Sequence, residues 1–493
     1  MYLIRNVTTK YHMTLPAPII PLNEVAIMDA AAIDLGQDLS QLMENAGAVL
    51  AREAERMVPG GSVLIVCGSH NNGGDGYVCA RLLAEAGRKV YLWPILPPQS
   101  RLCIEQAHRI PPTVTMVEGI PTPTPTLCID AMLGAGSKGR PREPYAAALS
   151  QLRKITCPIL SADVPSGIGS DLCLPAAMTI CFQVAKSDFM RQVGLGEFKT
   201  VDIGINPAAY LEVQPACMRR FPLHKRTGHK GTHGELLIIG GGAFPGALEF
   251  CARAAVMTGC DLVRAWTAEG HHLPPTVVAH TQDGHLLNSA DPQELTPLLV
   301  RASAVLIGPG LGREAGSVEA AQQAFSLAME MGVPTILDAD AIAALSDTIR
   351  EMPASDARLL ITPHRSEART LLGGVATDET LHAFARPDRV ILAKSVVDLI
   401  TDGRRWQQNP RGNPRMAVGG TGDVLAGVAA GIMARGATPF DAARMAVLWV
   451  TMAGDALWET HGPCYDALHL IDALPATLRS LLEPLNMWPP VTG

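Results

Sequence analysis

The sequence contains few aromatic and few charged residues. Phe, Trp and Tyr together make up 4% of its 493 residues and Asp, Glu, Lys and Arg make up 18%, whereas hydrophobic residues make up 47%. This balance excludes an intrinsically disordered chain. The length is too great for one ordinary core, which predicts two or three domains. A scarcity of aromatics beside many Ala, Gly, Val, Leu and Ile residues is typical of layered α/β proteins with parallel sheets.

Positive charge and long apolar runs are also lacking. The 40 Lys and Arg residues are outnumbered by 47 Asp and Glu residues, which gives a formal net charge of −7. Because Lys and Arg form no run, a nucleic-acid partner is not expected. No uninterrupted apolar stretch reaches the roughly 18 residues of a membrane span, and the N-terminal segment lacks the order of a signal peptide. We therefore expect a soluble, cytoplasmic protein without a membrane partner.

The cysteines show no pairing pattern. There are eleven, an odd number, and none forms a CxxC pair. Cys67, Cys79, Cys181 and Cys251 stand in apolar runs. The sequence therefore predicts small buried hydrophobic residues in a reducing compartment rather than disulfides.

Predicted strands and helices alternate in two blocks. Buried strands such as SVLIVCG and LCIDAML are followed by helices or Gly-rich loops, and the same pattern restarts at GELLIIGGG. This alternation predicts βαβ units, and thus two three-layer α/β domains with mostly parallel sheets. The pattern lapses around residues 207–222, where we place the boundary near residue 218. The predicted domains are residues 1–218 and 219–493.

The stretch NNGGDG, residues 71–76, separates a predicted strand from the helix YVCARLLAEAG. It is predicted to be a turn at the carboxyl end of a strand, where ligands bind in open parallel sheets. Its glycines would let a ligand approach the backbone, and the oxygens of Asn71, Asn72 and Asp75 suit a hard cation or a polyhydroxy ligand. The alternative is a plain tight turn closed by an Asn or Asp side chain.

Two further strand ends carry oxygen ligands. Asp130 ends the strand LCIDAML, and Asp163 and Ser166 follow the strand in PILSADVPSG. A carboxylate at such a place is costly unless it is paired or liganded. The three strand ends are therefore expected to converge on one site, although each Asp alone could simply cap a turn.

The motifs LMENAG, NNGGDG, DAMLGAG and DVPSG, in this order, resemble the NAD(P)H-hydrate epimerase family over about residues 20–210. The resemblance implies a Rossmann-like fold and interconversion of the two C6 epimers of hydrated NADH and NADPH. It implies K⁺ held by Asn72, Asp130 and Ser166, and a catalytic Asp163 that touches the nicotinamide ring. The implied hydrate-binding residues are Asn71, Asn72, Gly73, Gly74, Asp75, Gly134, Ala135, Gly136, Ser137, Lys138, Gly139, Arg140 and Asp163.

The stretch MAVGGTGDVLAG, residues 416–427, combines a Gly-rich loop with the start of a long helix. Free amides and the helix dipole would form an anion-binding hole. Asp423, in the first turn, is placed to take a proton from a hydroxyl that attacks a phosphoryl group. The alternative is an acidic residue that merely stabilises the helix N-terminus, by about 0.3–1 kcal/mol.

The motifs HKGTHGELLIIGG, GPGLG, LDADA, TPH and GNPRMAVGGTGDVLAG resemble the ADP- or ATP-dependent NAD(P)H-hydrate dehydratase family over about residues 224–480. The resemblance implies a ribokinase-like fold, with Asp423 as the base in phosphorylation of the C6 hydroxyl, followed by loss of phosphate. Ala247, Gly310, His364 and Asp423 would contact the S hydrate. Lys394, Ser395, Val396, Val397, Asp398 and Gly422 would contact the nucleotide, which is expected to carry Mg²⁺.

Together the two blocks resemble the bifunctional NAD(P)H-hydrate repair family, whose partners are NADHX, NADPHX and ADP or ATP; a homo-oligomer is expected. Ser395, Asp398 and Ser366 stand where the family usually has Gly, Thr and Gly, and a charge at Asp398 is expected to repel a nucleotide. Two alternatives stay open. One is a ribokinase-like kinase of a small alcohol with an N-terminal nucleotide-binding module, and the other is a non-catalytic pyridine-nucleotide sensor.

Overall fold

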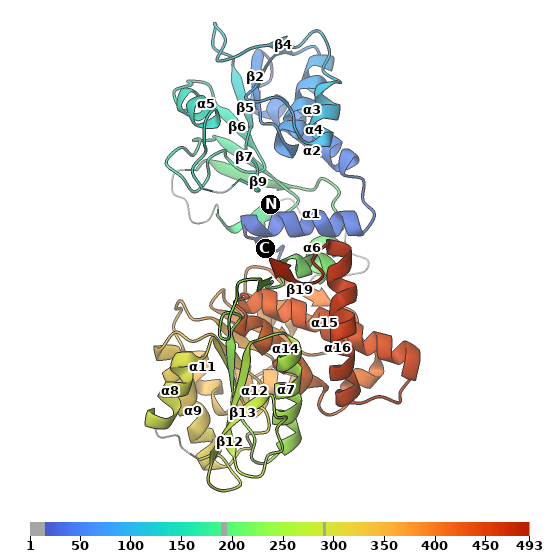
Figure 1. Cartoon of the computed structure of the whole chain (residues 1–493). Coiled ribbons are helices and arrows are strands. Elements are labelled where there is room, and N and C mark those ends of the chain that lie inside the picture. Colours follow the sequence, from blue (N-terminus) through green and yellow to red (C-terminus); the bar gives the residue numbers. More distant parts are fainter. Residues whose placement is uncertain (1–14, 138, 189–194, 289–291, 493) are drawn as a thin grey trace. The chain divides into compact units, whose positions relative to one another are not determined.

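The structure of the protein, a computed structural model, describes residues 15–137, 139–188, 195–288 and 292–492 (Figure 1). Contacts along the chain divide it into two compact units. The N-terminal unit is Ala17–Ala209, and the C-terminal unit is Tyr210–Gly493 together with the short segment that ends at Pro16.

The contact division falls between Ala209 and Tyr210, whereas the sequence placed the boundary near residue 218. The intervening residues belong to the second unit because Val213, Cys217 and Met218 are buried in its core. This packing joins residues that are far apart in the sequence, so the local pattern around residues 207–222 did not reveal it.

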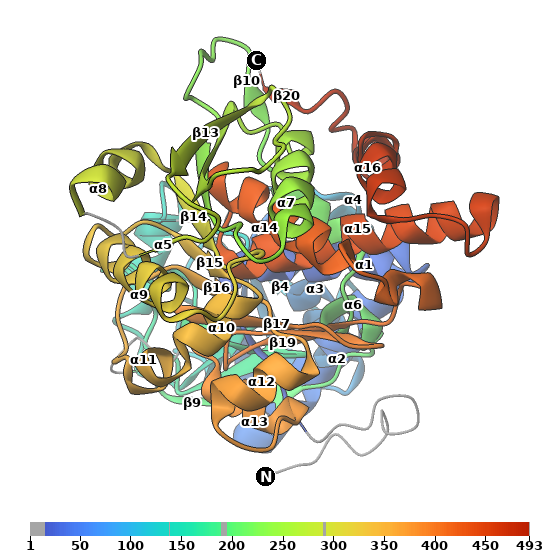
Figure 2. The same cartoon turned by 90° about the horizontal axis from the view of Figure 1, so that it is seen from below.

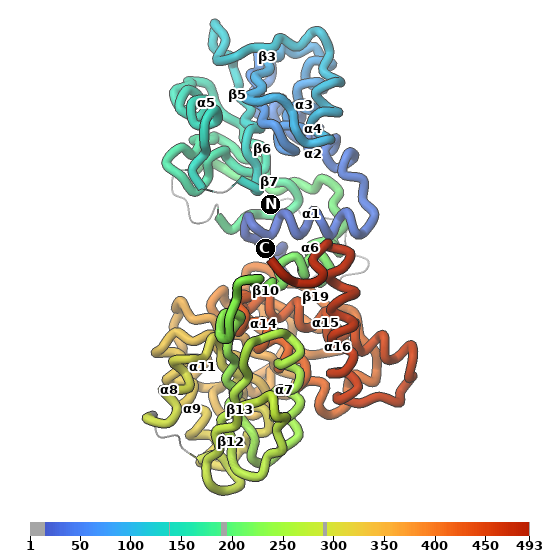
Figure 3. Tube along the Cα trace, viewed as in Figure 1, coloured from blue at the N-terminus to red at the C-terminus, as the bar shows by residue number. Residues whose placement is uncertain are grey.

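The N-terminal unit is built on a seven-stranded sheet in the order β4-β3-β2-β5-β6-β7-β9, and every neighbouring pair is parallel. The strands are β2 (Ser62–Cys67), β3 (Lys89–Pro94), β4 (Thr115–Met116), β5 (Leu127–Ala131), β6 (Ile159–Ala162), β7 (Met178–Phe182) and β9 (Glu197–Val201), with β1 (Ile19–Ile20) and β8 (Ala185–Lys186) as a separate parallel pair. The helices are α1 (Val25–Asp34), α2 (Leu39–Met57), α3 (Asn71–Glu85), α4 (Arg101–Ala107) and α5 (Tyr145–Leu152), and the short helix α6 (Ala208–Leu211) spans the division between the two units. Helices α2, α3 and α4 cover one face of the sheet and α5 covers the other, and α3 lies beside α4 along the trace (Figures 1 and 3).

The C-terminal unit is built on a nine-stranded sheet in the order β13-β12-β11-β14-β15-β16-β17-β18-β19. Its strands are β11 (Glu235–Ile239), β12 (Leu262–Ala268), β13 (Val277–Gln282), β14 (Ala304–Ile307), β15 (Thr335–Leu337), β16 (Leu359–Ile361), β17 (Arg389–Ala393), β18 (Asp398–Thr401) and β19 (Trp406–Asn409), with β10 (His224–Lys225) and β20 (Val491–Thr492) as a separate pair. Its helices are α7 (Pro245–Met257), α8 (Pro292–Arg301), α9 (Ala315–Glu330), α10 (Asp340–Ala344), α11 (Ser346–Glu351), α12 (Arg365–Leu372), α13 (Asp378–Phe384), α14 (Thr421–Ala434), α15 (Pro439–His461) and α16 (Ala467–Leu482). The pairs from β13 to β17 are parallel, while β17-β18-β19 are antiparallel. Helices α7, α14, α15 and α16 lie on one side of the sheet, and α8, α9 and α11 on the other (Figure 2).

The prediction of two three-layer α/β domains with mostly parallel sheets is confirmed. All eleven cysteines lie in the described ranges and none forms a disulfide. Cys67, Cys79, Cys181 and Cys251 are fully buried, as their apolar surroundings predicted. Among the described residues, no helix combines the length and apolar character that crossing a bilayer requires.

The prediction of a turn at residues 71–76 is wrong, because α3 already begins at Asn71. Glycine in a helix costs about 0.5–1 kcal/mol relative to alanine, so tertiary contacts must hold this turn of helix in place. A Cβ atom on Gly73 would lie 2.0 Å from the carbonyl oxygen of Gly68, and one on Gly76 would lie 2.7 Å from the Cβ of Ala131 and from the Sγ of Cys67. The glycines thus allow α3 to pack closely against the sheet and the preceding loop.

Gly76→Ala is therefore expected to destabilise the N-terminal unit by about 1–3 kcal/mol, although alanine is the better helix former. Gly119→Ala is the matched control, because its nearest neighbouring heavy atom would be 4.0 Å from the new methyl group. Calorimetric unfolding should show a lower midpoint for Gly76→Ala than for Gly119→Ala. Equal midpoints would contradict the packing explanation.

Candidate active sites

Asp130 is the centre of a hydrogen-bonded group at the carboxyl edge of the N-terminal sheet. It lies in β5 and is fully buried. The Ser166 hydroxyl donates to its Oδ1 at 2.6 Å, and the Ser166 amide and the Ser161 hydroxyl donate to its Oδ2 at 2.8 and 3.0 Å. Burial raises the pKa of Asp130, and the hydrogen bonds from Ser166 oppose this rise. The predicted convergence of Asp130 and Ser166 is confirmed.

Asn72 reaches the same loop from the start of α3. A Cβ atom on Gly134 would lie 3.3 Å from the Cβ of Asn72, and the Leu133 amide donates to the Ser166 hydroxyl at 2.9 Å. The Nδ2 atom of Asn72 is buried and has no hydrogen-bond partner among the described residues. Asn72, Asp130 and Ser166 therefore place oxygen-bearing side chains next to residues 132–134. The side-chain NH2 group of Asn72 has no hydrogen-bond partner there, within the described ranges.

Asp163 follows β6 and forms a buried ion pair. Lys186, which is 1% exposed, donates its Nζ to Oδ1 of Asp163 and to the carbonyl oxygen of Phe182. The φ angle of Asp163 is +62°, a left-handed conformation that aspartate tolerates better than most residues with a side chain. A buried charge pair at an unusual backbone conformation is typical of a functional position.

Asp75 lies in the field of these charges. Burial raises its pKa well above the ordinary value, and the negative charges of Asp163 and Asp29 raise it further. The two carboxyls of Asp75 and Asp163 therefore differ in their environments: Asp163 is paired with a lysine, whereas burial disfavours the charged form of Asp75. Two acids whose environments differ in this way can serve as a base and an acid in one site.

The other residues predicted for the first site have no hydrogen bond to the Asp130 group or to the Asp163–Lys186 pair among the described residues. Gly74 is buried against Met43, whose side chain would lie 2.6 Å from an added Cβ, so its smallness is explained by packing on α2. Arg140 forms an exposed ion pair with Asp171 at 2.9 Å. Gly134, Ala135, Gly136, Ser137 and Gly139 belong to the loop after β5, and Lys138 lies outside the described residues.

The second site lies where three neighbouring parallel strands end. Asp338 follows β15, Thr362 follows β16 and Lys394 follows β17. Asp338 is 2% exposed, and its Oδ1 accepts hydrogen bonds from the Lys394 Nζ and the Thr362 hydroxyl, both at 2.7 Å. Burial opposes the charge on Lys394, but Asp338 and Glu367 together raise its pKa. Ala339, the next residue, has a φ of +50°, a conformation that costs about 1–3 kcal/mol and marks the strand end as constrained.

Asp423 lies in the first turn of α14, as predicted, and it interacts electrostatically with Asp338 and Lys394. Burial raises its pKa to about 7, with a further rise from the negative charge of Asp338 and an opposing effect from Lys394. A Cβ atom on Gly422 would lie 3.6 Å from the Lys394 Nζ, so the start of α14 adjoins the lysine. A carboxyl with a pKa near neutrality is suited to general-base chemistry.

Ala247 and Gly310 meet beside α14. A Cβ atom on Gly310 would lie 3.4 Å from the Cβ of Ala247. One turn later on α7, the Cys251 thiol donates to the carbonyl oxygen of Asp423 at 3.1 Å. A side chain at Gly427 would lie 2.3 Å from the Cys251 carbonyl oxygen, so the two helices pack at close range. This contact brings the residues predicted to bind the hydrate near Asp423.

His364 caps helix α12. Its Nδ1 accepts from the Glu367 amide at 3.2 Å and lies 3.1 Å from the Ser366 hydroxyl, while the Glu367 carboxylate accepts from the His364 amide at 2.8 Å. The Lys394 amide donates to the Pro363 carbonyl at 2.8 Å, which brings the cap next to the lysine. His364 is thus both a helix cap and a neighbour of the charged group.

The loop between β17 and β18 holds the remaining predicted residues. Val396 is 93% exposed and Val397 is 40% exposed. Asp398 is buried, and its carboxylate accepts from the Ser395 amide at 3.0 Å and from the Asn409 side chain at 3.2 Å. Burial also raises the pKa of Asp398. The Asp398 carboxylate therefore stabilises the loop through these hydrogen bonds. Its engagement there reduces the repulsion of a nucleotide that the sequence led us to expect.

Three residues of these sites were not predicted from the sequence. Asp338 stands in the motif LDADA, and Glu367 follows the motif TPH by three residues, but no role was assigned to either. Lys186 follows the strand in CFQVAK, and nothing in that stretch indicates a buried partner for it. Among the described residues, no group of three or more His, Cys, Asp and Glu side chains is arranged to hold a metal ion.

Comparisons with known proteins find a family match in each of the two units. Residues 236–476 match the family model for NAD(P)H-hydrate dehydratase, and residues 39–187 match the model for the YjeF-related protein N-terminus. The chain is 34% identical to a bifunctional NAD(P)H-hydrate repair enzyme of Hyperthermus butylicus, over 94% of this chain and 93% of that one. It is 33% identical to one from Methanothermobacter thermautotrophicus, over 92% and 94%. A solved structure of the ADP/ATP-dependent NAD(P)H-hydrate dehydratase of Bacillus subtilis with ATP and Mg²⁺ is 22% identical, with a TM-score of 0.45 over 55% of this chain and 99% of that one.

Proposed function

Because the chain belongs to the family of bifunctional NAD(P)H-hydrate repair enzymes, we propose that its two charged sites perform the two reactions of that family. The protein is an isomerase that epimerises hydrated NADH and NADPH and a lyase that dehydrates the S form. We assign epimerisation to the N-terminal unit and dehydration to the C-terminal unit. The observation that carries the assignment is that each carboxyl edge holds its own buried lysine–aspartate pair beside an acid of raised pKa.

Epimerisation at C6 must break and re-form a bond to that carbon. We assign Asp163 as the base that takes the proton of the C6 hydroxyl while the bond from C6 to the ring nitrogen opens. Asp75, whose protonated form is favoured by burial, gives a proton to the ring nitrogen, and closure of the ring on the opposite face returns both protons. Lys186 holds the Asp163 carboxylate in place. Asn71 and Asn72 stand at the start of α3 to bind the hydrate, together with the loop after β5.

The proposal includes K⁺ in the N-terminal site. Asn72, Asp130 and Ser166 provide the oxygen atoms that a hard cation prefers. One observation supports the fit: burial disfavours the negative charge of Asp130, which a cation would stabilise. When bound, K⁺ would supply positive charge to a phosphate or hydroxyl of the hydrate.

Dehydration uses the nucleotide to convert a poor leaving group into a good one. Asp423 takes the proton of the C6 hydroxyl as its oxygen attacks the terminal phosphorus of ADP or ATP, and the bond to the leaving nucleotide breaks. Loss of phosphate from C6 and of one ring proton then restores the dihydropyridine. Lys394, whose Nζ adjoins Gly422, would neutralise phosphate charge, and we assign Ala247, Gly310 and His364 to contact with the hydrate. Mg²⁺ would arrive with the nucleotide phosphates and neutralise further charge there.

The test is to incubate the full-length protein with mixed R and S NADHX and to follow the return of NADH absorbance with and without ADP or ATP. Complete recovery of both epimers only with nucleotide is expected. Recovery of the S form alone would contradict the N-terminal assignment, and absence of any recovery with nucleotide would contradict the C-terminal one. Repeating the assay with tetramethylammonium in place of K⁺ should slow epimerisation while leaving the dehydration of pure S hydrate fast.

The family match favours repair of the hydrates over the two alternatives. A small-alcohol kinase would share the Asp423 site, but the relatives that match both blocks are repair enzymes. The non-catalytic sensor was favoured by Ser395 and Asp398, but the Asp398 carboxylate is buried and accepts hydrogen bonds from the Ser395 amide and the Asn409 side chain.

A further inference from the structure

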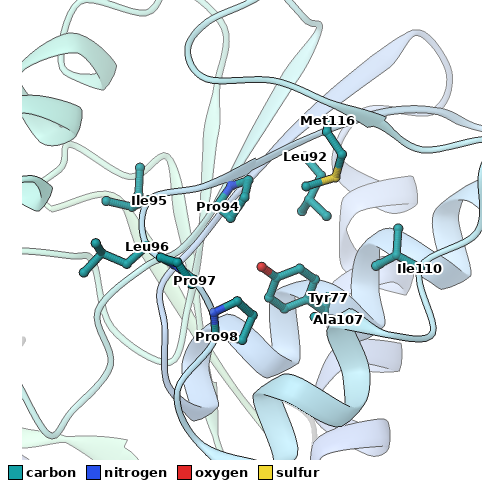
Figure 4. Close-up of a pocket in the computed structure, with 10 residues that line it drawn as sticks. All are labelled: Tyr77, Leu92, Pro94, Ile95, Leu96, Pro97, Pro98, Ala107, Ile110 and Met116. Atoms are coloured by element: carbon teal, nitrogen blue, oxygen red, sulfur yellow. The ribbon is translucent and has the colours of Figure 1, made fainter.

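A pocket of about 350 Å³ lies in the N-terminal unit and has no part in the chemistry described above (Figure 4). Its walls are Leu92 and Pro94 on β3, Met116 on β4, Tyr77 on α3, Ala107 on α4, Ile110 and the loop 95–98. It therefore lies at one side of the sheet, near the carboxyl end of β3.

The lining of the pocket suits a flat aromatic ring. Three proline rings, those of Pro94, Pro97 and Pro98, stand around it together with the ring of Tyr77 (Figure 4). The Tyr77 hydroxyl points toward the centre, and it is the one polar group among the lining side chains. Burial raises the pKa of Tyr77, so that the phenol stays a neutral hydrogen-bond donor. Apolar walls with one directed donor fit a heteroaromatic ring that carries acceptor nitrogens.

The wall of the pocket is tied to the segment that precedes and begins α3. The Ile95 amide donates to the Cys67 carbonyl at 3.0 Å, and the Gln99 amide donates to the Ser69 carbonyl at 2.7 Å. The Ser100 hydroxyl donates to the Asn71 side chain at 2.9 Å. The pocket is therefore adjacent to the residues assigned to the hydrate, and it shares helix α3 with them.

The strand order places the pocket and Asp163 on opposite sides of strands β2 and β5. From β2, the sheet continues to β3 on one side and to β5 and β6 on the other. A dinucleotide binds across such a reversal of strand order, with one half on each side. Asp163, assigned to the nicotinamide half, follows β6, whereas the pocket adjoins β3. Three strand spacings of about 4.8 Å separate β3 from β6, or roughly 14 Å, a span suited to an extended dinucleotide.

We propose that this pocket binds the adenine ring of the NAD(P)H hydrate during epimerisation. The proposal rests on the assignment of epimerisation to the N-terminal unit and adds the part of the substrate that this unit recognises. Burial of the adenine would supply binding energy that holds the reacting ring near Asp163, far from the adenine itself.

The test compares NADHX with the hydrate of reduced nicotinamide mononucleotide, which lacks the adenosine half. The full chain is assayed without ADP or ATP, so that only epimerisation proceeds, and R and S forms are separated by chromatography. Ala107→Phe fills the pocket and should lower the ratio of kcat/KM for NADHX to kcat/KM for the shorter hydrate at least about tenfold. Ile104→Phe, on an exposed position of the same helix, is the control and should keep the wild-type ratio.

Tyr77→Phe is the second variant, because it keeps the ring and removes only the donor. It should lower the same ratio about threefold to tenfold through KM for NADHX. An unchanged ratio in both variants would overturn the proposal, as would an equal loss for both hydrates. If the wild-type chain epimerised neither hydrate, the assignment of epimerisation itself would fail, which is a different outcome.

Discussion

Asp423→Asn is expected to abolish dehydration of S NADHX while epimerisation of the R and S forms continues. Asn keeps the shape of the side chain in the first turn of α14 but cannot accept the proton of the C6 hydroxyl. Loss of a general base lowers the rate by about 10²–10⁴-fold. The measurement is the initial rate of NADH formation from S NADHX with saturating ATP, beside a chromatographic assay of epimerisation.

Asp378→Asn is the matched control for this variant, because Asp378 also stands in the first turn of a helix of the C-terminal unit. It should retain the wild-type rate of dehydration. If Asp423→Asn kept more than about a tenth of the activity, Asp423 would not be the base. Loss of both reactions in Asp423→Asn would contradict the existence of two separate sites.

The raised pKa of Asp423 predicts the pH dependence of dehydration. Its pKa is about 7 because the carboxyl is buried near the negative charge of Asp338. A base must be ionised to act, so kcat/KM should fall about tenfold for each unit of pH below 7 and become constant above it. Asp338→Asn removes a negative charge and should move this midpoint to lower pH. A midpoint that stayed in place in that variant would contradict the electrostatic explanation.

Asp163→Asn is expected to stop epimerisation and to leave dehydration of pure S NADHX unchanged. The amide oxygen can still accept a hydrogen bond from Lys186, but it cannot take a proton from the substrate. With mixed R and S hydrates and ATP, this variant should convert only the S fraction to NADH. The R form should be consumed no faster than it changes spontaneously into the S form. The measurement is the fraction of NADH recovered, together with chromatography of the residual R form.

Stability has to be followed for this variant, because removing one partner of a buried ion pair can cost about 3–5 kcal/mol. The double variant Asp163→Asn with Lys186→Met removes both charges and should unfold at a temperature nearer that of the wild type, again without epimerisation. Asp34→Asn, at the exposed end of α1, is the control with normal activity. Normal epimerisation by Asp163→Asn would remove Asp163 from its assigned role.

Much of the first site could be predicted from the sequence because parallel strands bring their carboxyl ends to one edge. Asp130 and Ser166 stand at successive strand ends, and the structure joins them at 2.6 Å. In the second site, Asp423 was predicted in the first turn of a helix and is found there. The partner of Lys394 was not predicted, because Asp338 lies 56 residues away and no local pattern connects the two.

The sequence by itself determined the layered α/β class and the polar strand ends, because continuous apolar runs and Gly-rich stretches are local signals. Only the tertiary structure decided that NNGGDG begins a helix. Its residues favour a turn, and contacts of Gly73 and Gly76 with distant segments outweigh that preference. Only the tertiary structure paired Lys186 with Asp163. It also directed the Asp398 carboxylate toward the Ser395 amide within the same loop. The free-energy difference between residue types in local conformational preference is about 1 kcal/mol per residue. Buried packing contacts and paired charges each contribute several kcal/mol, so these long-range contacts determine the conformation where the two conflict.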